Sequence, residues 1–228
     1  MAFDEHFIRQ QICDIGRRVW DRGMVAANDG NLTVKINENE ILCTPTGVSK
    51  GFMTPDMICK VDLGGNVLKS DGIYRPSSEI KVHLKVYKRR PDVNAVVHAH
   101  PKYATAYAIV GRPLTKQIIP EATLSFGEVP VAKYALPSSA ELADSIEPFL
   151  DTHDVVLLQN HGALCWGEDL IAAYFKMESL EFYAELCFIT EVLGGAKELP
   201  NSEVERLLDL RRRIGMSGRH SLLHGKKR

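Results

Sequence analysis

Two histidines one residue apart follow an apolar run in the segment Val96-Val97-His98-Ala99-His100. The run predicts a buried strand, and side chains two positions apart on a strand point to the same face, about 7 Å apart. A third histidine, His161, stands in Asn160-His161-Gly162, directly after a second apolar run at residues 155–158. Three imidazoles that leave a fourth position open are a common way to hold a catalytic zinc ion.

A single strand histidine is more often a core residue whose ring nitrogens bond to neighbouring groups. The His-x-His pair, combined with a histidine after a second strand, favours a metal site instead. The predicted ligands are His98, His100 and His161, and the predicted cofactor is one Zn²⁺ per subunit. Mn²⁺ or Co²⁺ would also accept these ligands.

The composition is that of an ordinary globular protein, and its charge gives no attraction for nucleic acid. The 228 residues suffice for one domain with a buried core, and the formal net charge is −1 with 25% charged residues. No run approaches the roughly 18 apolar residues of a membrane span, and we expect neither a signal peptide nor membrane association. Five scattered cysteines without a C-x-x-C pair indicate free thiols, so we expect a cytoplasmic protein.

The residue pattern predicts an α/β protein with many short strands. Helical spacing and end signals predict helices at about residues 4–22, 77–90, 102–110, 138–150, 170–193 and 202–213. Strands are predicted around His98 and at residues 32–36, 41–43, 60–63, 67–69, 117–119, 129–132, 155–159 and 163–166. Because short strands outnumber β-α-β units, we expect a mixed, mostly antiparallel central sheet with helices on both faces.

One domain is expected to span residues 1–215. Residues 216–228 end in Lys226-Lys227-Arg228 and are predicted to form a basic, flexible tail. A binding role for nucleic acid is not expected of this tail.

Three small polar segments indicate an anion site. A helix is predicted to begin at Ser77-Ser78, and a helix N-terminus presents free N–H groups and partial positive charge. Thr46-Gly47 and Gly30-Asn31 are glycine-containing turns of the kind that let backbone approach an anion. Each alone is also ordinary turn or helix-cap chemistry. With a metal site in the same chain, and without a Walker-type loop, they favour a small phosphate ester over a nucleotide.

Glu79 lies in the first turn of the predicted helix after Ser77, and two interpretations stay open. Its carboxylate could complement the helix dipole, or it could be a general base near the metal. His83, one turn later, falls on the apolar face and is interpreted as a packing residue. The remaining histidines, His6, His153, His220 and His224, are predicted to be exposed and receive no role.

These motifs, in this order, resemble the class II aldolase/adducin-head family, whose aldolases include the L-fuculose-1-phosphate type. The most specific stretches are Arg75-Pro76-Ser77-Ser78-Glu79 and Asn94-Ala95-Val96-Val97-His98-Ala99-His100. The resemblance runs from the first helix to about residue 193. It implies a three-layer αβα sandwich and a homotetramer with sites near subunit interfaces.

The resemblance also implies roles for individual residues. His98, His100 and His161 would hold zinc, and Glu79 would be the acid/base that also touches zinc when substrate is absent. The substrate phosphate would be held by Asn31, Thr46, Gly47, Ser77 and Ser78. The implied reaction is that of a zinc-dependent lyase, which cleaves a short ketose 1-phosphate to dihydroxyacetone phosphate and an aldehyde. Epimerases of the family carry aspartate at the place of Glu79, so glutamate favours the aldolases.

The chain departs from the fuculose aldolase pattern in two places. Those enzymes carry a tyrosine in the loop where this chain has Glu121, and a second tyrosine near the C-terminus, whereas no tyrosine follows Tyr183 here. Glu121 could be an additional catalytic carboxylate or a surface charge. The alternative function is therefore a dehydratase or decarboxylase of a sugar-acid or methylthioribulose phosphate. A non-enzymatic module like the adducin head is disfavoured because the predicted ligands are all present.

Overall fold

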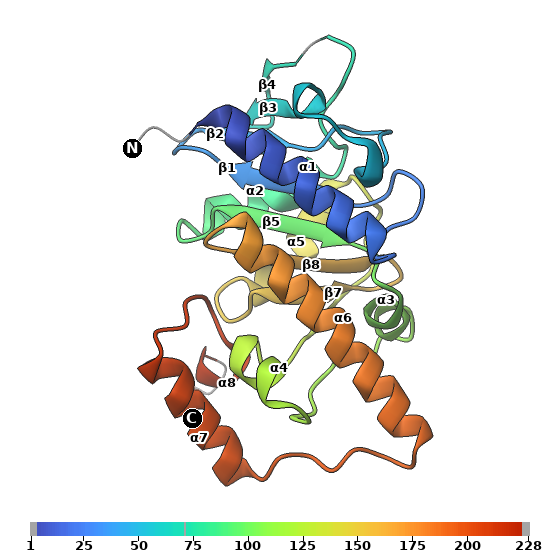
Figure 1. The fold of residues 1–228 in the computed structure, drawn as a ribbon, viewed down its shortest axis with the longest axis vertical. Helices are drawn as coiled ribbons and strands as arrows, with labels where there is room; N and C mark the ends of the chain where they lie inside the picture. The colour runs from blue at the N-terminus through green and yellow to red at the C-terminus, as the bar shows by residue number, and fades with distance from the viewer. Residues whose placement is uncertain (1–3, 71, 225–228) are drawn as a thin grey trace.

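The structure, a computed structural model, describes residues 4–70 and 72–224, and one eight-stranded sheet runs through them (Figure 1). The strands are β1 Asn31–Lys35, β2 Glu40–Cys43, β3 Cys59–Asp62, β4 Val67–Lys69, β5 Ala95–Ala99, β6 Val131–Ala132, β7 Val155–Leu158 and β8 Gly162–Gly167. Their order across the sheet is β4-β3-β2-β1-β5-β8-β7-β6. All neighbours are antiparallel except β6 and β7. The predicted mixed, mostly antiparallel sheet is confirmed.

Helices cover both faces of this sheet. They are α1 Glu5–Asp21, α2 Ile80–Arg89, α3 Lys102–Ile109, α4 Pro120–Ser125, α5 Ala140–Ser145, α6 Leu170–Val192, α7 Asn201–Arg213 and α8 Ser221–His224, with short 3₁₀ turns η1 Lys50–Phe52, η2 Pro55–Met57 and η3 Glu147–Phe149. Figure 1 shows α1 and α6 in front of the sheet and α2 and α5 behind it. Two separate buried clusters, one on each face, make this the predicted three-layer αβα sandwich.

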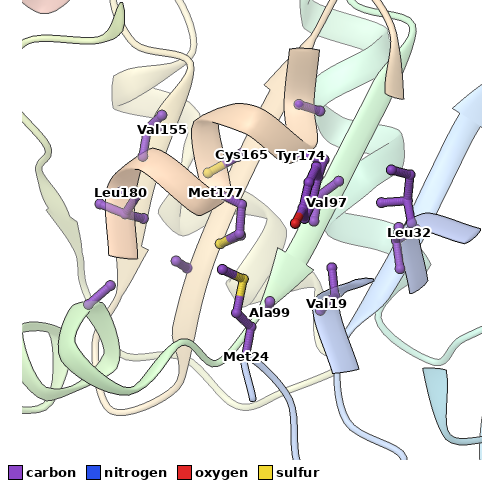
Figure 2. Packing of buried hydrophobic residues seen from close by; sticks show 14 of the residues in the cluster. Val19, Met24, Leu32, Val97, Ala99, Val155, Cys165, Tyr174, Met177 and Leu180 are labelled. Atoms are coloured by element: carbon purple, nitrogen blue, oxygen red, sulfur yellow. The ribbon is translucent and has the colours of Figure 1, made fainter. Parts of the chain in front are cut away.

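The larger cluster lies between the sheet and the helices α1, α3 and α6. Figure 2 shows its packing, with Tyr174, Met177 and Leu180 of α6 over Val97, Ala99 and Cys165 of the sheet. Asp169 is the N-cap of α6, where its carboxylate accepts a hydrogen bond from Ala172 N, and the helix ends before Gly194 and Gly195. Aspartate at the start and glycine at the end are ordinary helix boundary signals, which explains why the sequence predicted this helix.

The pairing of β5 brings distant residues to one end of the sheet. His98 pairs with Asn31 of β1 on one side and with Leu164 of β8 on the other. β7 and β8 form a hairpin in which Leu158 pairs with Gly162, so His161 lies in the turn between them. The three strands therefore present Asn31, His98 and His161 at the same end.

Two local predictions were wrong because prolines redirect the chain. Residues 117–119 form no strand, and they lead into the short helix α4, which begins at Pro120 with its fixed φ. The helix predicted to reach residue 150 ends at Ser145, and Pro148 lies in the separate turn η3. Its N-cap is Ser139, whose hydroxyl accepts from Leu142 N.

Within the expected C-terminal tail, His220 and Ser221 are packed against the domain, whereas residues 216–218 are exposed. His220 is fully buried, and its Nε2 donates to Thr123 O at 2.6 Å. Ser221 Oγ accepts from Glu128 N and donates to Phe126 O. The expectation that His220 is exposed was therefore wrong. Residues 225–228, where the rest of the tail prediction falls, lie outside the described residues.

No helix in the described ranges combines the length and the apolar character needed to cross a membrane. The five cysteines are buried, and none of them forms a disulfide.

Asp154 is a buried carboxylate that joins the sheet to the C-terminal segment. Its side chain, 1% exposed, lies 3.0 Å from Arg90 Nη2 and 2.7 Å from Lys176 Nζ. It also accepts from Arg219 N at 3.0 Å.

We predict that Asp154→Ala lowers the free energy of unfolding by about 3–5 kcal/mol, because it leaves two buried cations without their shared partner. Chemical denaturation would measure the change. The control is Asp151→Ala, which removes an exposed ion pair with Arg89 and should cost less than about 1 kcal/mol. Equal losses for the two variants would contradict the assigned role of Asp154.

Candidate metal centre

Three imidazoles converge at one end of the sheet. His98 is the penultimate residue of β5, His100 follows the strand directly, and His161 comes from the turn between β7 and β8. One ring nitrogen of each lies within 4.8 Å of the others. Among the described residues, these three histidines form a cluster that could hold a metal ion.

The ligand atoms fit one divalent ion. Nitrogens bound tetrahedrally to zinc lie roughly 3.3 Å apart, from bond lengths of about 2.0–2.1 Å. His98 Nε2 and His100 Nε2 are 3.1 Å apart. His98 Nδ1 donates to Ala163 O at 2.9 Å, which leaves the lone pair of Nε2 directed at the other rings. A backbone acceptor on the far nitrogen is the usual support of a ligating histidine.

Glycine makes the close approach of these rings feasible. A Cβ on Gly162 would lie 2.5 Å from both Ala99 O and His100 Cδ2, so a larger residue would displace the ring. Gly30 has φ +75, and a Cβ there would lie 2.9 Å from His98 O. The Asn160-His161-Gly162 turn therefore depends on a residue without a side chain at its last position.

Glu79 is the N-cap residue of α2, but its side chain makes no cap hydrogen bond. Glu79 Oε2 lies 3.3 Å from His98 Nε2, and Oε1 lies 3.1 Å from His161 Nε2. Asn31 Nδ2 donates to Oε2 at 2.9 Å. The carboxylate therefore faces the imidazoles and does not cap the helix.

Electrostatics keep this carboxylate ionised. Burial acts to raise the pKa of Glu79, but hydrogen bonds and positive charge from His161 and His98 outweigh it and hold the pKa well below its usual range. Burial, together with repulsion from His98 and His161, lowers the pKa of His100 to about 3. A neutral imidazole beside a carboxylate is the state in which these residues ligate a metal.

His83 packs behind this group. Burial lowers its pKa to about 3, and its Nδ1 lies 2.9 Å from Thr33 Oγ1, which also contacts the hydroxyl of Tyr87. Its interpretation as a packing residue agrees with this burial.

Two of the three segments predicted to bind an anion lie side by side. Thr46 N donates to Arg75 O at 2.9 Å, and Ser77 N donates to Thr44 O at 3.1 Å, so the turn at Thr46-Gly47 meets the start of α2. Gly47 has φ +74, and no atom lies within 4 Å of the place where its Cβ would be. The turn thus leaves its backbone open to an approaching group.

Asn31 and Ser77 are buried, whereas Thr46, Gly47 and Ser78 are exposed. Asn31 Oδ1 is buried, and within the described ranges it has no hydrogen-bond partner.

Two findings differ from what the sequence indicated about the surroundings of the site. Ser138 Oγ donates to Ser78 Oγ at 2.9 Å, a contact that the sequence missed because the two serines are far apart in the chain. Glu121 is exposed in the first turn of α4, and among the described residues it forms no hydrogen bond or ion pair. The structure therefore brings His98, His100, His161, Glu79 and Asn31 together, without a contact to Glu121.

Comparison with known proteins identifies the family. Residues 10–188 match the model of the class II aldolase and adducin N-terminal domain. The chain belongs to this family. α7 and α8 lie beyond the matched residues.

Curated relatives carry two different names. An L-fuculose phosphate aldolase of Methanococcus maripaludis is 38% identical over 175 residues, which are 77% of this chain and 93% of the relative. A 3-oxo-tetronate 4-phosphate decarboxylase of Haemophilus influenzae is 33% identical over 205 residues, which are 87% of this chain and 95% of the relative. A solved L-fuculose 1-phosphate aldolase has a TM-score of 0.81 at 28% identity, covering 91% of this chain and 96% of its own.

We predict that His98→Ala abolishes stoichiometric metal binding, because only two of the three imidazoles would remain to hold the ion. Elemental analysis of the purified variant would measure this. His6→Ala, which changes an exposed histidine on α1, should retain the metal content of the unaltered protein. Full metal content in the His98 variant would show that the ion binds elsewhere.

Proposed function

We propose that the protein is a metal-dependent class II aldolase of carbohydrate metabolism. The reaction is cleavage of a short ketose 1-phosphate, of the L-fuculose 1-phosphate type, to dihydroxyacetone phosphate and an aldehyde. The observation that carries this proposal is the group of three imidazoles whose open side is faced by Glu79. Relatives at 35–38% identity that are named L-fuculose phosphate aldolase support it.

Zinc is the proposed cofactor, held by His98, His100 and His161, with Glu79 beside them. Three neutral imidazoles suit zinc, and they would also accept Mn²⁺ or Co²⁺. When bound, the ion supplies a Lewis acid that polarises the substrate carbonyl and stabilises the negative charge left by carbon–carbon cleavage.

The substrate phosphate is proposed to lie at the start of α2, between Ser77-Ser78 and the Thr46-Gly47 turn. Hydroxyl and backbone N–H groups there are donors, and the N-terminus of α2 adds partial positive charge. Asn31, hydrogen-bonded to Glu79, places a further polar group between this position and the imidazoles.

Glu79 is proposed to move the proton of the reaction. In the synthetic direction its carboxylate removes a proton from the carbon that becomes nucleophilic, and in cleavage it returns that proton. The hydrogen bond from Asn31 Nδ2 to Oε2 keeps the carboxylate oriented when the imidazoles bind the metal ion.

The assembly is proposed to be a homotetramer in the cytoplasm, with sites near subunit interfaces. Phe175, Phe182 and Phe188 expose large apolar surfaces along α6, which another copy of the chain would cover. Glu121 is proposed to serve the second substrate, and its exposure on α4 is compatible with acting across a subunit boundary.

A decarboxylase or dehydratase on the same scaffold is the second candidate. It is favoured by relatives named 3-oxo-tetronate 4-phosphate decarboxylase, which are 32–33% identical over 81–87% of this chain. Glu121, where the fuculose aldolases have tyrosine, fits this alternative. Its substrate would be a sugar-acid phosphate or methylthioribulose phosphate.

We predict that Glu79→Gln keeps bound metal but lowers kcat by about 10²–10⁴-fold, because an amide cannot accept the substrate proton. Steady-state kinetics with parallel elemental analysis would separate chemistry from metal loss. Unchanged turnover in a metal-loaded variant would place the base elsewhere.

Product analysis of the metal-loaded enzyme tests the reaction itself. The panel is L-fuculose, ribulose and methylthioribulose 1-phosphates together with a 3-oxo-tetronate 4-phosphate. We expect dihydroxyacetone phosphate from a ketose 1-phosphate, detected by its coupled reduction with NADH. Release of carbon dioxide or water, without formation of dihydroxyacetone phosphate from any ketose 1-phosphate, would replace the aldolase with the second candidate.

A further inference from the structure

Lys50 is a buried cation with an unusual set of partners. It opens η1, and the residue is 1% exposed. Its Nζ donates to Asn28 O at 3.0 Å and to Val48 O at 2.6 Å. Within the described ranges it forms no ion pair with a carboxylate.

A buried charge is normally paired with an opposite charge, because desolvation is otherwise too costly. The carboxylate that acts on Lys50 electrostatically is Asp29, which is 46% exposed and directed toward His100 Nδ1 at 3.7 Å. Burial lowers the pKa of Lys50 to about 8, and Asp29 opposes this shift only in part. At neutral pH the ammonium is therefore mostly charged, and its charge is not neutralised by a direct partner.

The two carbonyl acceptors belong to the two glycine-containing turns of the anion site. Asn28 precedes Gly30-Asn31, and Val48 follows Thr46-Gly47 directly. The ammonium thus joins these turns from their buried side, although Asn28 and Val48 are 20 residues apart in the chain.

Packing against α1 fixes the backbone of Lys50. A Cβ on Gly16 would lie 3.2 Å from Lys50 O, and one on Gly51 would lie 2.7 Å from the ring of Trp20. Both glycines therefore allow η1 to lie directly on α1. A cation on a fixed backbone holds its acceptors at a fixed separation, which is the geometry that preorganised anion sites require.

We propose that Lys50 is the positioning residue and buried counter-charge of the phosphate site. It fixes the spacing of the Gly30-Asn31 and Thr46-Gly47 turns and supplies a positive charge that the phosphate dianion neutralises. This inference rests on the proposed function, because the phosphate is assigned to these turns there. A purely structural lysine would stabilise the fold and leave phosphate recognition unchanged.

The test compares Lys50→Met and Lys50→Gln with the unaltered enzyme. Methionine keeps the length of the side chain without a donor, and glutamine keeps one donor without the charge. The matched control is Lys35→Met, because Lys35 Nζ also donates to a backbone carbonyl, that of Pro91, from the other end of β1. Binding of inorganic phosphate is measured by calorimetry, and metal content by elemental analysis.

We expect both Lys50 variants to bind phosphate at least about tenfold more weakly, the equivalent of one lost charge-assisted hydrogen bond. KM for a phosphorylated ketose should rise by a similar factor, while kcat, metal content and KM for the unphosphorylated ketose change little. The control should match the unaltered enzyme in all of these.

The outcomes separate the two proposals. Phosphate binding by folded Lys50 variants that equals the unaltered enzyme overturns the role of Lys50 and leaves the phosphate site intact. Failure of the unaltered enzyme to bind phosphate, or to prefer the phosphorylated ketose, overturns the phosphate site and the role of Lys50 with it.

A measurement on the unaltered protein decides the matter if neither variant folds. We expect bound phosphate to raise the pKa of Lys50, because a nearby anion favours the charged ammonium. NMR of lysine labelled at Cε would measure this change in the resonance that titrates near pH 8. A pKa that phosphate leaves unchanged overturns the proposal.

Discussion

The pairing of β5 between β1 and β8 is the constraint on which the site depends. It places His98 opposite Asn31 on one side and Leu164 on the other, and it sets Ala163 O within reach of His98 Nδ1. A slip of one residue would turn the side chains of β5 to the opposite face of the sheet. Because both neighbours pair with β5 along its length, and both faces are buried, that slip is strongly disfavoured.

The charge distribution at the site follows from this geometry. Burial and repulsion from the neighbouring imidazoles lower the pKa of His100 to about 3, so its ring is a neutral ligand, while Glu79 remains an anion beside it. A divalent ion held by neutral imidazoles beside one carboxylate would give the centre a net positive charge of one. The buried ammonium of Lys50, together with the N-terminus of α2, adds positive potential on the side of the polar turns. The whole end of the sheet is thus suited to an anionic substrate, although the chain as a whole is nearly neutral.

Local signals explain what could be predicted from the sequence. α1 carries clear apolar periodicity, α6 carries clear end signals, and the His-x-His pair needs only the two-residue repeat of one strand. The failures involve contacts between distant segments. His220 looks exposed in the sequence because its burial depends on α4, nearly a hundred residues earlier. Lys50 carries no periodic signal, because its partners are backbone carbonyls that any residue could supply.

Relatives with two different named reactions match this chain over most of its length. The imidazoles and polar turns, which lie within the family region, therefore do not by themselves decide the fate of the substrate. We propose that groups facing the other end of the substrate decide it, with Glu121 on α4 as the candidate. The C-terminal segment holds that helix, since Arg211 donates to Leu124 O and Ser125 O, and His220 donates to Thr123 O. These contacts satisfy carbonyls at the C-terminal end of α4, which the helix itself leaves unpaired. Residues beyond the matched family region thus fix the position of the helix on which reaction specificity is expected to depend.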